Sequence, residues 1–197
     1  MTRLEASRLL ASTLRGEPVI ASLGHPAYDL FAAEDRPLNF YTWGSMGLAS
    51  SIGLGLAQAR PDLRVIVVDG DGSLLMNLGS LATMGSTRPP NLVLVVWDNQ
   101  EYGTTGGQET ATAHGADLEA AATAMGLLAT TVSTERALRE AVAQACVEPG
   151  PWVIVAKVKE SAPKAKPPLD CVFIKQRFMA AIGNPEAATT GAPIRSA

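Results

Sequence analysis

The sequence has few of the residues that mark a secreted, membrane-bound or nucleic-acid-binding protein. Its two cysteines, Cys146 and Cys171, have neither CxxC nor metal-ligand spacing, so we expect reduced thiols in a cytoplasmic protein. Charged residues make up only 18% of the chain and the net charge is −3, which leaves no basic surface for nucleic acid or an anionic membrane. No apolar run reaches the roughly 20 residues of a membrane-spanning helix. Arg and Glu interrupt the apolar positions near the N-terminus, which argues against a secretory signal.

What the sequence does have is a hydrophobic fraction of 47% in 197 residues, enough for one domain with a full core. Short apolar runs alternate with segments of helical periodicity, a pattern typical of a parallel sheet covered on both faces. We therefore predict the α/β fold class, as a three-layer α/β/α domain over residues 1–182 with a flexible tail at 183–197. The predicted strands are 18–22, 38–42, 64–68, 91–97, 129–132 and 152–158, and the predicted helices include 48–59, 117–125, 134–147 and 172–182.

Two neighbouring strands end in polar residues. The strand at 64–68 leads into Gly-Asp-Gly-Ser at positions 70–73, and the strand at 91–97 leads into Asp98 and Asn99. The distance along the chain between Asp71 and Asn99 matches one strand–helix–strand crossover. Because parallel strands end at the same edge of a sheet, we expect these two side chains to lie close together.

The chemistry of this pair of turns indicates a magnesium and phosphate site. Gly72 and Ser73 open a predicted helix, where free backbone N–H groups and the helix dipole attract a phosphate. Asp71 and Asn99 offer hard oxygen ligands, too few for an all-protein cage but suited to Mg²⁺, which also takes water and phosphate oxygens. Either turn alone would be read as an ordinary connection between elements. The two together predict a bound metal diphosphate.

Three segments resemble a known superfamily. They are FYTWGSMGLASSIGLGLA at 40–57, GDGSLLMNLGSLATM at 70–84 and DNQEYGTTGGQ at 98–108. These motifs resemble the thiamine-diphosphate enzymes of the decarboxylase and acetolactate-synthase superfamily. They are most similar to the beta subunits of sulfopyruvate decarboxylase and to the matching part of phosphonopyruvate decarboxylase, over about residues 3–182.

The resemblance implies roles for individual residues. The magnesium ligands would be the Asp71 and Asn99 side chains and the backbone carbonyl of Glu101. The Gly44 carbonyl would accept from the 4′-amino group of the cofactor, and the Met46 side chain would hold its two rings in a V shape that brings the reacting atoms together. Core packing is the alternative role for Met46. The implied cofactor-binding residues are Gly44, Ser45, Met46, Gly70, Asp71, Gly72, Ser73, Asn99, Glu101, Tyr102 and Gly103.

The substrate is expected to meet the Gly-rich loop at 102–108. Together with Met46, the residues assigned to catalysis are Thr104, Thr105 and Gln108, whose hydroxyls and amide could hold a small polar 2-oxo acid. The alternative is a flexible lid that makes no direct contact. His25 and His114 are expected to be solvated loop residues. Lys157 and three other lysines, Lys159, Lys164 and Lys175, are expected to form a solvated face.

The resemblance also implies a partner. Enzymes of this superfamily use a glutamate on a separate pyrimidine-binding module, and this chain has room only for the diphosphate-binding module. We therefore expect an alpha-type, pyrimidine-binding subunit that supplies the catalytic Glu, in a hetero-oligomer such as α₂β₂ or larger. The expected reaction is the decarboxylation of a sulfopyruvate- or phosphonopyruvate-like 2-oxo acid to an aldehyde.

Alternatives remain open at this point. In the sulfonate and phosphonate enzymes the segment around His25 commonly carries Ser-Arg-Glu, whereas this chain has Ala27, Tyr28 and Asp29, which leaves the substrate unsettled. A carboligase or 2-hydroxyacyl lyase would use the same residues, and a non-catalytic cofactor-binding subunit is the third reading. A Rossmann-type nucleotide module ranks low because the G-x-G-x-x-G turn is missing.

Overall fold

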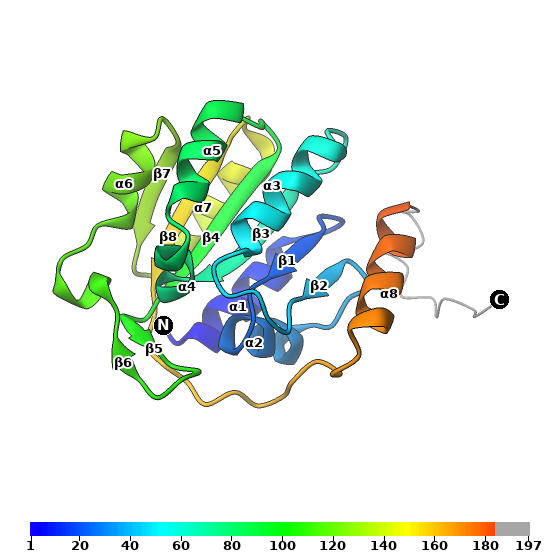
Figure 1. Ribbon diagram of the computed structural model, residues 1–197, viewed down its shortest axis with the longest axis horizontal. Helices are drawn as coiled ribbons and strands as arrows, with labels where there is room; N and C mark the ends of the chain where they lie inside the picture. The colour runs from blue at the N-terminus through cyan, green and yellow to red at the C-terminus, as the bar shows by residue number, and fades with distance from the viewer. Residues whose placement is uncertain (184–197) are drawn as a thin grey trace.

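The computed structural model describes residues 1–183 and contains a six-stranded parallel sheet between two layers of helices (Figure 1). The strand order is β2-β1-β3-β4-β8-β7, and every neighbouring pair is parallel. The strands are β1 (Val19–Ala21), β2 (Asn39–Tyr41), β3 (Val65–Gly70), β4 (Leu92–Asp98), β7 (Leu128–Val132) and β8 (Trp152–Lys157). The predicted α/β/α fold is thus confirmed. The tail was predicted at 183–197; Gly183 instead ends a helix, and residues 184–197 lie outside the described residues.

The helices cover both faces of the sheet, and each face packs against one layer of helices. Residues such as Ile66 and Val68 point to one layer, while Val65 and Val67 point to the other, and all four are fully buried. This burial on two sides explains why the strands read as unbroken apolar runs. One layer holds α1 (Arg3–Thr13), α2 (His25–Ala33) and α7 (Glu135–Val147); the other holds α3 (Ala49–Ala59), α4 (Asp71–Met76), α5 (Gly79–Thr87) and α6 (Leu118–Ala124).

Small residues bring two helices close to their neighbours. A Cβ atom added to Gly53 of α3 would lie 2.1 Å from the Val67 side chain of strand β3. A Cβ atom added to Gly85 of α5 would lie 1.9 Å from the backbone oxygen of Met125, at the end of α6. Only glycine fits at these two contacts without movement of the neighbour.

Three local predictions need correction. The helix after Gly-Asp-Gly-Ser is divided into α4 and α5, because Asn77 leaves the helical conformation and its side chain donates to the Gly47 carbonyl at 3.0 Å. The Gly-rich loop is the tip of a hairpin formed by β5 (Glu101–Tyr102) and β6 (Gln108–Glu109). His25 is the first residue of α2, preceded by a Gly at φ 74° and followed by a Pro in the first turn, and His114 ends the short 3-10 helix η1 (Ala111–His114).

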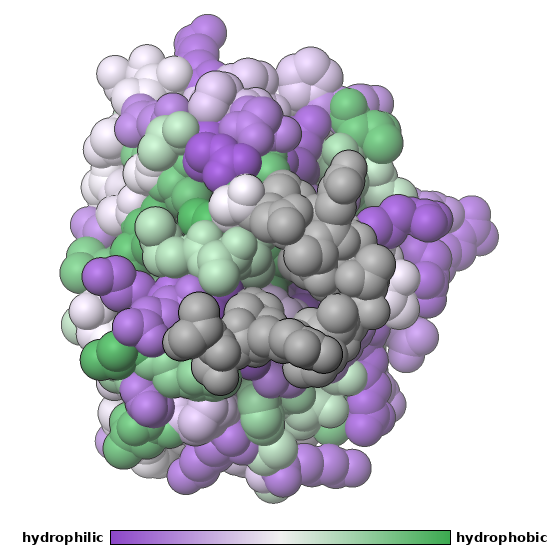
Figure 2. Space-filling model, turned by 90° about the vertical axis from the view of Figure 1, so that its right-hand side faces the viewer, coloured by the Kyte–Doolittle hydropathy of each residue, from purple (hydrophilic) through white to green (hydrophobic). Residues whose placement is uncertain are grey.

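The last described helix, α8 (Cys171–Gly183), lies beside the edge strand β2 and is reached by a connector that crosses below α2 (Figure 1). Hydrophobic and hydrophilic surface alternate on the side of the molecule that carries α8 (Figure 2). Val172, Phe173 and Met179 are exposed on this helix.

Cys171 and Cys146 are free thiols, as predicted. Among residues 1–183, no helix has both the length and the apolar character needed to cross a bilayer.

Candidate active site

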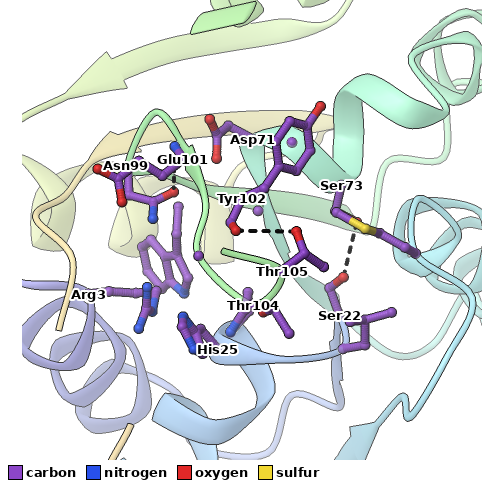
Figure 3. Close-up of a pocket in the computed structure, with 17 residues that line it drawn as sticks. Arg3, Ser22, His25, Asp71, Ser73, Asn99, Glu101, Tyr102, Thr104 and Thr105 are labelled. Carbon is purple, nitrogen blue, oxygen red and sulfur yellow. Dashed lines mark hydrogen bonds between the residues drawn. The ribbon is translucent and has the colours of Figure 1, made fainter. Parts of the chain in front are cut away.

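A cavity of about 60 Å³ lies where β1, β3 and β4 end, at the carboxyl edge of the sheet (Figure 3). Asp71 and Asn99 both line it, which confirms that the crossover places them at the same edge. The other predicted site residues that line it are Met46, Gly70, Gly72, Ser73, Glu101, Tyr102, Gly103, Thr104 and Thr105. Gly44 and Ser45 instead line a second hollow between the turn after β2 and α8, and Gln108 lies exposed on β6.

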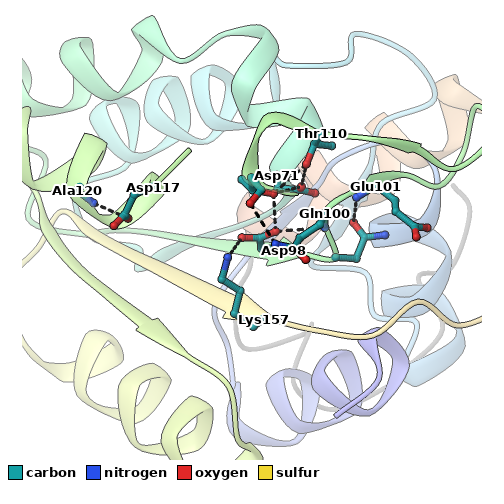
Figure 4. Close-up of polar contacts among 10 residues, drawn as sticks. Asp71, Asp98, Gln100, Glu101, Thr110, Asp117, Ala120 and Lys157 are labelled. Atoms are coloured by element: carbon teal, nitrogen blue, oxygen red, sulfur yellow. Dashed lines mark hydrogen bonds and ion pairs between the residues drawn. The ribbon is translucent and has the colours of Figure 1, made fainter. Parts of the chain in front are cut away.

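Asp71 is buried at the start of α4 and is held by two hydroxyl groups (Figure 4). The hydroxyls of Thr110 and Thr112 donate to its Oδ2 atom at 2.6 and 2.9 Å. Burial raises the pKa of Asp71, although both hydroxyls act in the opposite direction. Neither hydroxyl engages Oδ1, so one carboxylate oxygen is left for a cation.

A second carboxylate supports the first. Asp98, the last residue of β4, accepts from the Thr112 hydroxyl at 2.9 Å and forms an ion pair with Lys157 on β8 (Figure 4). Thr112 therefore bridges Asp71 and Asp98. The expectation of a solvated face holds for Lys159, Lys164 and Lys175, which are exposed. Lys157 differs, because parallel register sets it beside the buried Asp98 and its side chain is 42% exposed.

Asn99 and Glu101 form a tight turn between β4 and β5. The backbone N–H of Glu101 donates to Asn99 Oδ1 at 3.4 Å, and Gln100 between them has φ 65°. Within residues 1–183, no three His, Cys, Asp or Glu side chains are grouped as metal ligands. The oxygen donors present, a carboxylate, a carboxamide and a backbone carbonyl, are the hard ligands that suit Mg²⁺.

The start of α4 has the shape of a phosphate cradle with a cover. A Cβ atom on Gly72 would lie 2.4 Å from the Tyr102 ring, so this ring rests on the Gly72 backbone. The Ser73 hydroxyl accepts from the Gly47 N–H at 2.9 Å and bonds to Ser22 at 3.1 Å, which ties three turns together. The Tyr102 ring of the β5–β6 hairpin therefore covers the backbone that a diphosphate would contact.

A charged cluster that sequence reasoning missed borders the cavity. The buried Arg3 donates to Asp29 at 2.6 Å and also pairs with Glu160. The Nδ1 atom of His25 lies 3.0 Å from Glu160 Oε1, off the line of a hydrogen bond. Burial and then the Arg3 charge lower the pKa of His25. The one sequence signal for this cluster was that Glu160 follows the last strand of the sheet.

Comparison with known proteins identifies the family. Residues 25–156 match the thiamine pyrophosphate enzyme C-terminal TPP binding domain. The chain is 45% identical to sulfopyruvate decarboxylase subunit beta of Methanococcus maripaludis, over 92% of this chain and 98% of that protein. The chain belongs to the family of sulfopyruvate decarboxylase beta subunits. It is also 38% identical to phosphonopyruvate decarboxylase of Streptomyces viridochromogenes, over 95% of this chain but only 48% of that protein.

Solved structures agree with this family at the level of the fold. A putative thiamin diphosphate-dependent enzyme from Mycobacterium smegmatis superposes with a TM-score of 0.71 at 22% identity, over 82% of this chain and 32% of that chain. The match of residues 25–156 to the TPP binding domain and the identity to the beta subunit confirm the resemblance drawn from the motifs. The roles of the individual cavity residues stay predictions.

Proposed function

We propose that this chain is the beta-type subunit of a heteromeric enzyme that decarboxylates a small, sulfopyruvate- or phosphonopyruvate-like 2-oxo acid to an aldehyde. The observation that carries the proposal is the meeting of Asp71, Asn99 and the Gly72 helix start at one cavity. When bound, thiamine diphosphate supplies the electron sink for loss of CO₂, and the protein supplies binding, orientation and electrostatics.

The metal and the diphosphate would be held by the two polar turns. The Asp71 and Asn99 oxygens and the Glu101 carbonyl bind Mg²⁺, with the remaining positions taken by phosphate oxygens and water. The backbone N–H groups of Gly72 and Ser73 bind the diphosphate. The buried Thr112 supports this arrangement, because its hydroxyl donates to Asp71 Oδ2 and fixes the orientation of the carboxylate while Oδ1 stays available.

The rings and the substrate would meet the two flanking loops. Ser45 has φ 62° and Gly47 has φ 85°, a sharp turn that supports the role of Met46 at the cavity wall. Thr104 and Thr105, at the hairpin tip, would bind the polar groups of the 2-oxo acid. Gln108 could join them only after movement of the hairpin, since it is exposed outside the cavity.

The glutamate that activates the cofactor would come from an alpha-type, pyrimidine-binding subunit. The relative coverage supports a divided enzyme, because this chain spans 98% of a subunit named beta but 48% of the longer phosphonopyruvate decarboxylase. Pairing of two halves gives a hetero-oligomer such as α₂β₂ or larger, with the site between subunits.

Calorimetric titration of thiamine diphosphate, with and without Mg²⁺, tests this proposal on the chain alone and on its complex with the pyrimidine-binding subunit. We expect Mg²⁺-dependent binding by the complex that Asp71→Ala abolishes. The exposed Asp62→Ala is the matched control and should bind as the wild type does. A complex that binds no thiamine diphosphate would overturn the proposal, and acyloin in place of aldehyde as product would indicate a carboligase.

A further inference from the structure

We propose that Glu160 is a positioning residue for Asn99. Its carboxylate fixes the orientation of the Asn99 carboxamide so that the amide oxygen, and not the amino group, faces the metal position. The inference rests on the proposed function, because it takes Asn99 as a ligand of Mg²⁺.

The geometry of the contact determines which end of the amide points where. Asn99 Nδ2 donates to Glu160 Oε2 at 2.6 Å, while Asn99 Oδ1 lies on the other side and accepts from the Glu101 N–H. An ionised carboxylate has only acceptors, so the group that faces it must be the amino group of the amide. Glu160 thereby turns Oδ1 toward the β4–β5 turn, where the Glu101 carbonyl also lies.

Glu160 is itself held in place by a buried guanidinium. Arg3 pairs with Glu160, and its side chain is only 3% exposed. The same guanidinium donates to Asp29 at 2.6 Å and to the Ser161 carbonyl at 2.8 Å, so its orientation is fixed on three sides. The backbone N–H of Arg3 also bonds to the Lys159 carbonyl at 3.0 Å. Although the Glu160 side chain is 33% exposed, these contacts hold it as part of the site wall.

Orientation matters because Mg²⁺ binds oxygen and not an amide nitrogen that carries two protons. Arg3 and Asn99 both bond to Glu160 Oε2, so a glutamine at position 160 can keep its oxygen there and still accept from both. In a Glu160→Leu variant no acceptor faces the Asn99 amide, and the amide is free to turn its amino group toward the metal. An aspartate at position 99 has two equivalent oxygens and is indifferent to such a rotation.

The experiment is a Mg²⁺ titration of the complex with its pyrimidine-binding subunit, at saturating thiamine diphosphate, followed by calorimetry. We expect Glu160→Leu to raise the Kd for Mg²⁺ by about 10- to 100-fold, the usual effect of losing a partner of a metal ligand. Adding Asn99→Asp to Glu160→Leu should return the Kd to within about threefold of wild type. The matched control is Glu140→Leu, which replaces an exposed glutamate on α7 that pairs with Arg136, and it should leave the Kd unchanged.

Two outcomes would overturn the inference alone: an unchanged Kd in Glu160→Leu, or a loss that Asn99→Asp does not restore. A wild-type complex that binds thiamine diphosphate without any Mg²⁺ dependence would overturn the proposed function as well. Glu160→Gln, which keeps an oxygen acceptor for Arg3 and Asn99, should bind Mg²⁺ more tightly than Glu160→Leu, and equal losses in the two variants would count against positioning. Thermal melts of each complex separate these effects from loss of folding.

Discussion

Asp69, the last but one residue of β3, is a fully buried carboxyl group with a measurable consequence for stability. Burial raises its pKa to about 6, against the opposing effects of the Ser73 and Ser22 hydroxyls and the Gly70 N–H. In an unfolded chain the pKa returns to the ordinary value of 3.8. The native state therefore prefers the protonated form, while the unfolded state releases the proton near pH 4.

The sign of the effect follows from proton binding. Between about pH 4 and about pH 6 the native state binds more protons than the unfolded state, so the free energy of unfolding falls as pH rises through this window. At 1.36 kcal/mol per pKa unit, the ionised Asp69 destabilises the native state by about 3 kcal/mol at pH 7. Asp69→Asn, which cannot ionise, should be more stable than wild type by up to about 3 kcal/mol at pH 7, with no difference below pH 4.

Urea unfolding of the chain at several pH values, without thiamine diphosphate or Mg²⁺, measures this difference. Asp117→Asn is the matched control: Asp117 is an exposed helix cap, where asparagine caps as well as aspartate, so stability should change by less than about 0.5 kcal/mol at any pH. A stability gain in Asp69→Asn that is the same at pH 4 and pH 7, or a loss at pH 7, would refute the reasoning.

Two further changes probe packing and charge. Gly85→Ala should lower the free energy of unfolding by about 1–3 kcal/mol, because its Cβ would meet the backbone oxygen of Met125, which can move only with its chain. Gly55→Ala is the matched control: its Cβ meets nothing within 4 Å, so the free energy of unfolding should rise by up to about 1 kcal/mol. Thermal melts of the two glycine variants measure these changes, and equal changes in stability would contradict the packing argument. Lys157→Met should destabilise the chain by about 1–3 kcal/mol at pH 7, since it leaves the buried Asp98 charge without its cation. Urea unfolding at pH 7 measures this loss, and a Lys157→Met chain as stable as wild type would contradict it.

The parts of the fold and site that could be predicted from the sequence are those coded by neighbouring residues. The strands β3 and β4 are continuous apolar runs, and the crossover between them is short, so the meeting of Asp71 and Asn99 could be deduced from spacing alone. The start of the helix predicted at 117–125 is equally local, since the Asp117 side chain accepts from the Ala120 N–H at 2.9 Å.

Contacts between distant segments could not be predicted in this way. Arg3 and Glu160 each look like ordinary surface charges, and only the folded sheet brings them together. The β5–β6 hairpin was missed because its glycines carry no strand pattern, although Tyr102 covers Gly72 from it. His25 was placed in a loop because the signal for the start of α2 is a left-handed glycine, whose conformation a sequence does not display.

The contact between Arg3 and Glu160 joins residues 157 positions apart, and it has a consequence for the order in which the protein is made. A ribosome that has delivered the chain through β5 has already supplied Asp71 and Asn99, yet Glu160, the residue proposed to orient Asn99, is still untranslated. Strand β8 must then enter between β4 and β7 before Glu160 can reach Arg3. On the proposed role of Glu160, nascent or prematurely terminated chains that lack β8 would hold Asp71 and Asn99 without the residue that orients Asn99.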